Sequence, residues 1–428
     1  MKKTTYLSLV IVFVATMLIG CGEDRTHEYY DLTEENQWIY SKMKEVYLWR
    51  DNIKEPKRSA FFSTTTKFFS SLLYSGDKAS FFTDTVATES YGMTFAIMRD
   101  PIGERPSKVY ALVLMVEPGS PADVAGVERG IWISSVDGVS FTTSKYSMLQ
   151  SGGCAKLVTE YIEFDDEAQK YYWNAGDTLQ IGAATTYTER AVLLDSIYSV
   201  RSKNIGYLVI NNFNGDDFIT TTQDALLRFE ANDVKEVVID LRYCTGGSIA
   251  NAASLASSFV APELYGTAFC HLLDVDGEID TTYNYAAQKA VLHDKKVFVI
   301  TGEQTVGVAE LFTAALNKSR PMNDLITFGA KSVAVNTVTE QLDSPYGFAI
   351  NPVTNYVALV GGELLSGVVP DYPVNELLQI ENIYPLGSEQ EYMFYNVLYY
   401  SALGAVPGDA GGADTQPLWR KRDNPFTK

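Results

Sequence analysis

The side chains that most often do chemistry are scarce in this chain of 428 residues. The histidines and cysteines are His27, His271, His293, Cys21, Cys154, Cys244 and Cys270. Three histidines and no C-x-x-C pair leave little room for a metal site, so the sequence predicts no metal and no other cofactor. A cysteine nucleophile is one alternative to consider. Cys244 lies beside Gly246 and Gly247, and His271 or His293 would serve as its base. Solvated or packed side chains are the favoured interpretation of both histidines.

The charge balance excludes one large class of function. The chain has 34 Lys and Arg against 53 Asp and Glu, a net charge of −19, with 46% hydrophobic residues. This composition is typical of a folded globular protein. Because nucleic-acid binding needs a basic face, no nucleic-acid partner is expected.

The N-terminus has the features of an export signal. Lys2 and Lys3 precede an apolar run over residues 7–19, which is too short for a membrane-spanning helix of about 20 residues. The run ends in Leu-Ile-Gly before Cys21, which resembles the bacterial lipoprotein signal. We therefore expect a lipoprotein signal peptide over residues 1–20, lipidation at Cys21 and a tether over residues 21–32. The alternative is an ordinary cleaved signal in which Cys21 is incidental.

This signal also implies a location. The protein is expected in a bacterial cell envelope, anchored by lipid to the outer membrane on its periplasmic or surface face. At most two of the three remaining cysteines can pair in that oxidising compartment, so one should be free and buried.

Residues 33–88 are expected to form a small helical domain. Apolar residues recur at helical spacing over residues 33–50, where Thr33 can cap the N-terminus with Gln37 nearby. A second helix is predicted near residues 64–73.

Residues 89–198 are expected to form a β-domain. Residues 91–97 and 109–116 alternate like strands, Ser120 and Pro121 can start a short helix, and Asp137-Gly138 is a hairpin turn. The string PGSPADVAGV at residues 118–127 resembles PDZ domains of bacterial proteases. The resemblance implies that a peptide adds a strand to a sheet edge while a loop binds its terminal carboxylate. That loop would consist of Tyr91, Gly92, Met93, Thr94 and Phe95, although Thr94 departs from the usual glycine. The alternative is a structural β-domain that binds nothing.

Residues 199–385 are expected to form a mixed sheet with crossover helices. Buried strand runs over residues 205–213, 236–242 and 297–301 alternate with helical stretches over residues 249–260 and 309–317. A last helix over residues 389–403 and a mobile Gly-, Pro- and Ala-rich tail are expected within residues 386–428. The predicted fold class is therefore α/β (α+β multidomain), with an N-terminal helical cap, a PDZ-like β-domain and a mixed-sheet domain.

Four strings in this order resemble the C-terminal processing (tail-specific) serine peptidases. They are IGYLVINNF, VVIDLRYCTGGS, VFVITGEQTVGVAELFTAALN and GVVPDYPV. The string NQWIYSKMKEVYLW further resembles the lipoprotein branch of Bacteroides-like bacteria. The resemblance implies a peptidase-like domain with a serine nucleophile at a helix N-terminus, a lysine base and a glutamine that orients the lysine.

The three catalytic positions carry other residues in this chain. The Glu310-Leu311 pair in VFVITGEQTVGVAELFTAALN sets the register there and places Gly307 at the serine position. A further string, GAKSVAVNTVT over residues 329–339, follows the next strand. Its Gly329 and its Thr337-Val338 pair place Val335 at the lysine position and Thr339 at the glutamine position. Glycine cannot attack a carbonyl and valine has no proton to exchange, so no catalytic residue is expected.

The expected function is therefore that of a catalytically inactive member that binds peptides or protein C-termini, with Gly246 and Gly247 in its cleft. One alternative is an active serine-type endopeptidase that uses non-standard residues, such as Thr305 or Lys331 with Ser332. Another is a lipoprotein that binds a glycan or another ligand, suggested by the 27 tyrosines.

Overall fold

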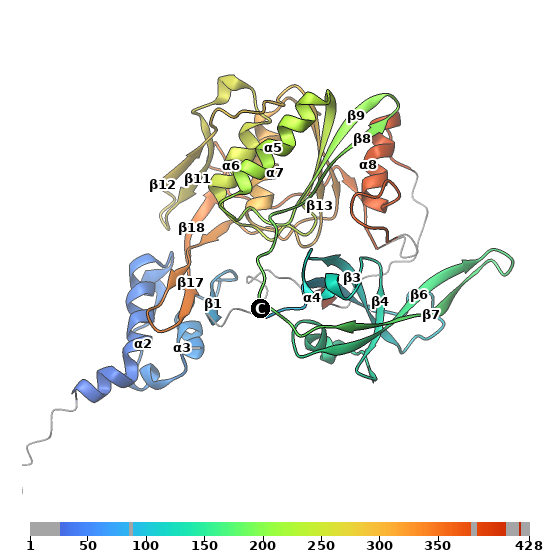
Figure 1. Ribbon diagram of the computed structural model, residues 1–428. Helices are drawn as coiled ribbons and strands as arrows, with labels where there is room; N and C mark the ends of the chain where they lie inside the picture. Colours follow the sequence, from blue (N-terminus) through green and yellow to red (C-terminus); the bar gives the residue numbers. More distant parts are fainter. Residues whose placement is uncertain (1–25, 85–88, 378–382, 408–418, 421–428) are drawn as a thin grey trace, which may run out of the picture.

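The computed structural model describes residues 26–84, 89–377, 383–407 and 419–420. Figure 1 shows a blue helical part, a teal β-domain with a long projecting hairpin, and a larger α/β part above both. The predicted class, a mixed α/β fold of several parts, is confirmed. The structure does not describe the side chains of the predicted signal peptide, of the lipidation site Cys21 or of His27.

The N-terminal part begins with α2 (Thr26–Val46), which starts seven residues before the predicted cap and inside the predicted tether. No glycine or proline interrupts residues 26–46, so nothing breaks the helix there. Thr33 is therefore not an N-cap; its Oγ1 accepts a hydrogen bond from Gln37 Nε2 at 2.7 Å. The helix ends at Val46, before the predicted end at residue 50. Just after it, Leu48 N–H donates to the Val353 carbonyl at 2.8 Å.

Beside the predicted helices, this part contains a strand that joins it to a distant segment. After η1 (Arg50–Asn52), η2 (Arg58–Phe62) and α3 (Thr65–Leu72) comes β1 (Phe81–Asp84), which pairs with β17 (Phe348–Asn351); β16 (Leu342–Asp343) completes the sheet. Ile39 and Phe68 share one core with Phe348 and Ile350. The apolar side chains of β17 cover the helices, which could not bury their own faces alone.

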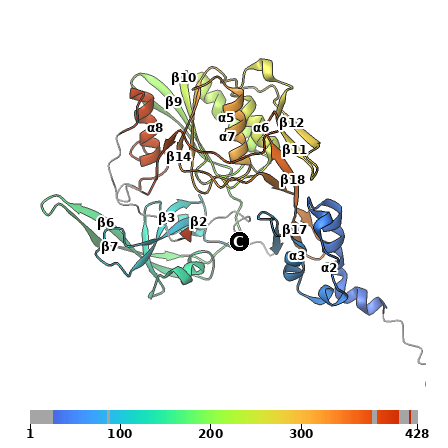
Figure 2. The ribbon, with the colours of Figure 1, turned by 180° about the vertical axis from the view of Figure 1, so that it is seen from behind.

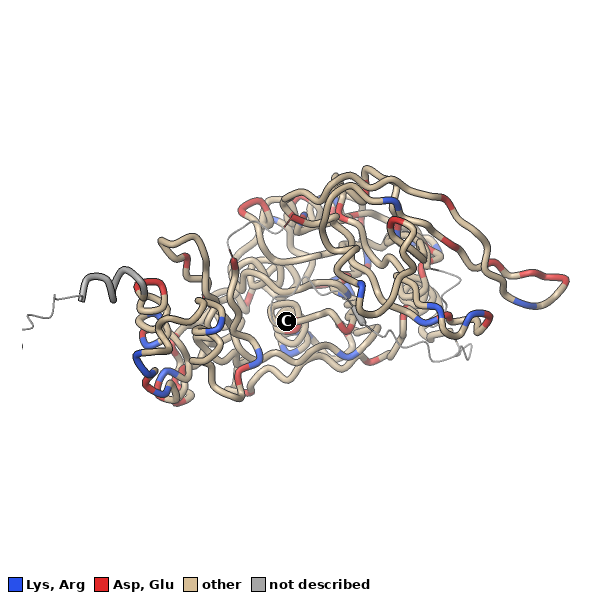
Figure 3. The backbone as a smooth tube through the Cα atoms, turned by 90° about the horizontal axis from the view of Figure 1, so that it is seen from below, with Lys and Arg blue, Asp and Glu red and all other residues tan. Residues whose placement is uncertain are grey.

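The β-domain is one antiparallel sheet in the order β20-β2-β3-β4-β6-β7. Its elements are β2 (Met93–Arg99), β3 (Val109–Val116), α4 (Pro121–Val124), β4 (Trp132–Val136), β5 (Val139–Ser140), η3 (Thr143–Leu149), β6 (Ala155–Asp165), β7 (Lys170–Ile181) and β20 (Trp419–Arg420). Ser120 caps α4 as predicted, and the turn at Asp137-Gly138 is confirmed by positive φ at both residues. Figure 3 shows acidic positions along the projecting β6–β7 hairpin, where Glu163 and Asp165 are exposed.

The α/β part is built on a mixed sheet in the order β19-β14-β13-β10-β9-β8. Its elements are β8 (Val192–Val200), β9 (Lys203–Ile210), α5 (Phe218–Ala231), β10 (Val234–Asp240), α6 (Ile249–Ser257), β13 (Lys296–Thr301), α7 (Val308–Ser319), β14 (Leu325–Gly329), β19 (Tyr372–Pro373) and α8 (Tyr392–Leu403). Helices α5, α6 and α7 cover one face and α8 the other (Figure 1). The predicted boundary at residue 198 was wrong, because β8 pairs with β9 along its length.

A second sheet, which the sequence did not reveal, lies beside α6 and α7. Its order is β12-β11-β18-β15, from β11 (Ala268–Leu273), β12 (Ile279–Asn284), β15 (Thr337–Thr339) and β18 (Val353–Ala358), with η4 (Pro262–Leu264) before it. Strand β15 forms one edge of this sheet.

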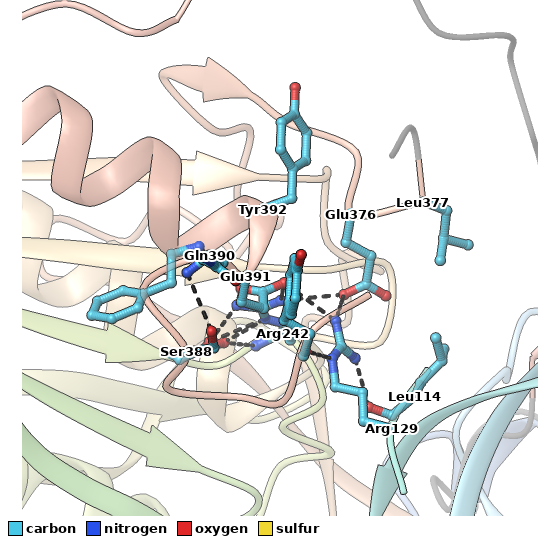
Figure 4. Close-up of polar contacts among 12 residues, drawn as sticks. Leu114, Arg129, Arg242, Glu376, Leu377, Ser388, Gln390, Glu391 and Tyr392 are labelled. Atoms are coloured by element: carbon cyan, nitrogen blue, oxygen red, sulfur yellow. Dashed lines mark hydrogen bonds and ion pairs between the residues drawn. The ribbon is translucent and has the colours of Figure 1, made fainter. Parts of the chain in front are cut away.

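A buried cluster of charges joins the β-domain to the α/β part (Figure 4). It contains Arg129, Asp240, Arg242, Glu376 and Glu391. Arg242 donates to both carboxylate oxygens of Glu391, at 2.7 and 2.8 Å, and to Asp240. Arg129 reaches Glu391 at 3.2 Å from the β-domain. Burial would raise the pKa of Glu391, but Arg242 and Arg129 lower it to about 2.

Candidate functional site

One cleft collects the positions that the sequence singled out. It encloses about 480 Å³ of empty space, part of it open to solvent, between the N-terminus of α7, the loop after β10 and strand β15. Its lining residues are Gly246, Gly247, Ile249, Gly307, Val308, Leu311, Val335, Thr337, Val338, Thr339 and Val357. None of these side chains is charged. The three predicted catalytic positions and the glycine pair thus meet at one place.

The glycine pair lets the loop after β10 pass close to the end of β9. Gly247 has φ +124°, and a Cβ there would lie 2.7 Å from the backbone nitrogen of Phe213. Phe213 N–H donates to the Gly246 carbonyl at 2.8 Å, which fixes the loop beside the cleft. A side chain at residue 247 would push this wall outward.

Gly307 occupies the position just before the first turn of α7. Its backbone has φ 60° and ψ −110°, and an added Cβ would meet no atom within 4 Å. A serine at residue 307 would therefore have room but would strain the backbone by about 1–3 kcal/mol. The wall at this point is bare backbone.

Val335 and Thr339 lie across the cleft from α7 on a segment that Glu310 holds. The Glu310 side chain is fully buried. Its Oε2 accepts from the backbone N–H of Gly307 at 2.7 Å and of Val335 at 3.0 Å. Its Oε1 accepts from Ser332 Oγ and from Ala334 N–H, both at 2.5 Å. One carboxylate therefore fixes both sides of the cleft, a role that the sequence did not reveal.

Replacing Glu310 with glutamine should loosen the cleft. The new amide group would face two hydrogen-bond donors that the carboxylate now accepts, at a cost of about 1–3 kcal/mol. Urea unfolding followed by tryptophan fluorescence measures this loss. Glu340→Gln, at an exposed position on the same segment, is the matched control and should change stability by less than about 0.5 kcal/mol. Equal stabilities of the two variants would contradict the role of Glu310.

The alternative nucleophiles are all engaged or buried. Thr305 Oγ1 donates to the Leu241 carbonyl at 2.7 Å and accepts from Gly302 N–H at 2.8 Å. Ser332 Oγ donates to Glu310 and accepts from Val368 N–H at 2.7 Å. Burial raises the pKa of the Cys244 thiol to about 12, which suppresses the thiolate.

None of the candidate bases is among the residues that line the cleft. His271 Nδ1 is 2.9 Å from Thr282 Oγ1 in the β11–β12 hairpin, while His293 and Lys331 are exposed. All three cysteines of the described residues are free: Cys154 is exposed, and Cys244 and Cys270 are buried. Within the same residues, no group of three or more His, Cys, Asp or Glu is placed to hold a metal ion.

The predicted carboxylate-binding loop is buried in the β-domain. Tyr91, Gly92, Met93, Thr94 and Phe95 are all buried. Tyr91 N–H donates to the Gln150 carbonyl and Gly92 N–H to Ser90 Oγ, each at 3.1 Å. Two amides that were expected to bind a peptide carboxylate therefore have partners within the protein.

Comparison with known families identifies the class of protein that this fold defines. The model of peptidase family S41 matches residues 204–374, and the model of the peptidase S41 N-terminal domain matches residues 34–83. The chain therefore belongs to peptidase family S41.

Individual relatives are distant. The chain is 21% identical to a probable CtpA-like serine protease of Staphylococcus haemolyticus, with 95% of this chain and 81% of the relative covered. A probable CtpA-like serine protease of Staphylococcus aureus is 24% identical, with 55% of this chain and 44% of the relative covered. The chain thus spans less than half of the Staphylococcus aureus relative.

Solved structures share the fold. A putative S41 protease from Bacteroides fragilis has a TM-score of 0.74 and 23% identity, with 85% of this chain and 96% of that chain covered. The photosystem II D1 C-terminal processing protease has a TM-score of 0.51 and 18% identity, with 81% and 94% covered. These likenesses support the architecture described above.

Proposed function

We propose that the protein is a catalytically inactive member of family S41 that binds peptide segments or protein C-termini in its cleft. One observation carries the proposal: the cleft brings together Gly307, Val335 and Thr339, whose side chains offer no thiol, amine or carboxylate. Their one hydroxyl, on Thr339, stands at the position of the family's glutamine and not at that of its serine. Protein substrates are the class on which peptidases of this family act, which favours a peptide as the ligand.

The lining of the cleft suits an extended peptide with apolar side chains. Val308, Leu311 and Val338 supply apolar surface, and Gly307 leaves backbone exposed to close approach. Strand β15 lies at the edge of its sheet along the same wall, where a peptide backbone can pair.

An active peptidase with non-standard residues is the second candidate, and the geometry argues against it. The Thr305 hydroxyl donates its proton to a backbone carbonyl, so that proton is engaged within the protein and not held by a base. A nucleophile that is displaced by about 1 Å from its productive position already costs on the order of a hundredfold in rate.

Attachment to a bacterial envelope membrane through Cys21 belongs to the same proposal and rests on the sequence, since residues 1–25 lie outside the described part. Among the described residues, no helix combines the length and the apolar composition that a membrane crossing needs.

The absence of chemistry is tested with a serine-reactive fluorophosphonate probe. We expect the purified protein to show no labelling above a heat-denatured sample. Stoichiometric labelling that disappears in Thr305→Ala or Ser332→Ala would overturn the proposal of inactivity.

Binding is tested on an immobilised library of peptides with free and amidated C-termini. The variant Val338→Trp fills the cleft and should lose at least tenfold of the binding signal. The control Val275→Trp adds the same bulk at an exposed position in the β11–β12 turn and should bind like wild type. No binding by wild type, or equal binding by both variants, would contradict the peptide site.

A further inference from the structure

The hairpin of β6 and β7 extends well beyond the sheet from which it comes. Strand β4 pairs with β6 from Leu157 to Glu160, and β7 is the last strand in the order β20-β2-β3-β4-β6-β7. Within the described part of the chain, residues 161–165 and 170–174 therefore pair only with each other. Figure 2, like Figure 1, shows the end of this hairpin pointing away from the rest of the molecule. We call residues 161–174 the arm.

The arm carries aromatic side chains although most of it lies outside a core. An isolated two-stranded hairpin is at best marginally stable in water. At the base of the arm, Trp173 is buried and stacks on Tyr110, with ring centroids 4.2 Å apart. Farther out, the Phe164 and Tyr171 rings are 4.8 Å apart, yet Phe164 is 41% exposed. Aromatic side chains that gather on an element projecting into solvent favour a contact surface.

The register of the two strands divides the arm into two faces. Side chains alternate along a strand, and directly paired residues share a face. Tyr161, Glu163 and Tyr172 lie on one face, because Glu163 pairs with Tyr172 and Tyr161 is two residues before Glu163. Phe164, which pairs with Tyr171, lies on the other face. The first face therefore places a carboxylate beside two aromatic rings.

These side chains suit a planar cation. Lys170 Nζ lies 4.8 Å from the centroid of the Tyr172 ring, so one ring of this face already holds a cation. The Tyr161 ring, which is 49% exposed, offers the same kind of surface beside the exposed Glu163. Asn174 Nδ2 donates to Glu163 Oε2 at 2.8 Å, and this neutral partner leaves the carboxylate charge in place. A guanidinium can pair with a carboxylate and stack on an aromatic ring, which the compact ammonium of lysine does less well.

The charge of the arm selects among the possible occupants of this face. Residues 161–174 contain four acidic side chains and one basic side chain, which gives −3, in a chain of net charge −19. Repulsion between like charges disfavours a second copy of this chain and an anionic lipid surface. A basic segment of another protein is favoured, and arginine and tyrosine are both enriched at protein interfaces.

We propose that the arm is a docking site for an arginine-bearing segment of a partner protein, in which a guanidinium stacks on Tyr161 and pairs with Glu163. None of the arm residues is among those that line the cleft at Gly307. The proposal therefore stands or fails independently of the proposed function.

The test uses fluorescence anisotropy to measure how a short fluorescein-labelled peptide of alternating glycine and arginine binds to the purified full chain. Companion peptides replace arginine with lysine or with citrulline, which has the shape of arginine without its charge. The variant Tyr161→Ser/Glu163→Gln removes both proposed contacts. The control Phe164→Leu/Glu278→Gln also loses one ring and one acid, but from the opposite face of the arm and from an exposed position outside it.

We expect the arginine peptide to bind to wild type, the lysine peptide to bind about threefold more weakly, and the citrulline peptide to bind at least about tenfold more weakly. Tyr161→Ser/Glu163→Gln should weaken binding of the arginine peptide by about tenfold, and the control by less than about twofold. Tyr161→Phe, which keeps the ring, should bind like wild type.

Absent binding by wild type would overturn the proposal. Equal losses in the two double variants, or equal binding of the citrulline peptide, would also overturn it, because the arm would then have no specific contact with a guanidinium. Loss of binding in Val338→Trp would place the peptide in the cleft and leave the arm without a ligand. A dimer in sedimentation velocity that Tyr161→Ser/Glu163→Gln abolishes would make a second copy of this chain the occupant, which contradicts the proposal as well.

Discussion

Replacing Arg242 with methionine should destabilise the protein by about 3–5 kcal/mol, the usual cost of breaking a buried ion pair from one side. Arg242 is 1% exposed and donates to the carboxylates of Asp240 and Glu391, which are equally buried. Without the guanidinium, both carboxylates would stay in the interior without their main counter-charge. Urea unfolding at neutral pH measures the loss.

The control for this prediction is Arg228→Met, which removes an arginine from an exposed ion pair with Asp195. Solvent screens that pair, so the loss should stay below about 1 kcal/mol. The double variant Arg242→Met/Glu391→Gln should cost less than the two single variants combined, because it removes a buried charge of each sign. Additive losses, or equal losses in the two methionine variants, would refute the role of the cluster.

The cluster matters to function because of where Arg242 stands in the chain. It directly precedes the loop of residues 243–247, which lines the cleft through Gly246 and Gly247. Tyr243 Oη in the same loop donates to Glu376 at 2.9 Å. We therefore expect that loss of Arg242 also weakens peptide binding at the cleft.

Local signals in the sequence were reliable where one short segment decided the structure. The Ser-Pro pair starts α4, the Asp-Gly pair forms its hairpin, and the strand β3 has the predicted bounds. These features depend on caps, turns and alternation within a few residues. The resemblance to the peptidase family likewise placed Gly307, Val335 and Thr339, which the fold brings to one cleft.

Features that depend on distant segments could not be predicted. Strand β1 needs β17, more than 260 residues away, and the four-stranded sheet beside α7 combines two separate hairpins. Glu310 served only to set a register in the sequence, because nothing in a single sequence shows that a glutamate is buried. Three of its four hydrogen bonds, those from residues 332–335, become visible only when that segment meets α7.

Acid should weaken the protein through Glu391 in a defined range of pH. In the folded state its pKa is lowered to about 2 from an ordinary value of 4.5, because Arg242 and Arg129 outweigh the effect of burial. Below about pH 5 the unfolded chain binds a proton on this group while the folded chain does not. Its contribution to stability is therefore complete above pH 5 and is lost as the pH falls towards 2. The loss amounts to about 3 kcal/mol.

Comparing wild type with Glu391→Gln isolates this effect, because glutamine does not titrate. The variant should be less stable than wild type at pH 7, and the difference should shrink by about 3 kcal/mol as the pH is lowered to 2. Urea unfolding at closely spaced pH values measures the difference, and Glu340→Gln corrects for exposed acids. A stability difference that stays constant from pH 7 to pH 3 would mean that Glu391 is not charged in the folded interior. The cluster that joins the β-domain to the α/β part would then not be held by the ion pairs of Glu391 with Arg242 and Arg129.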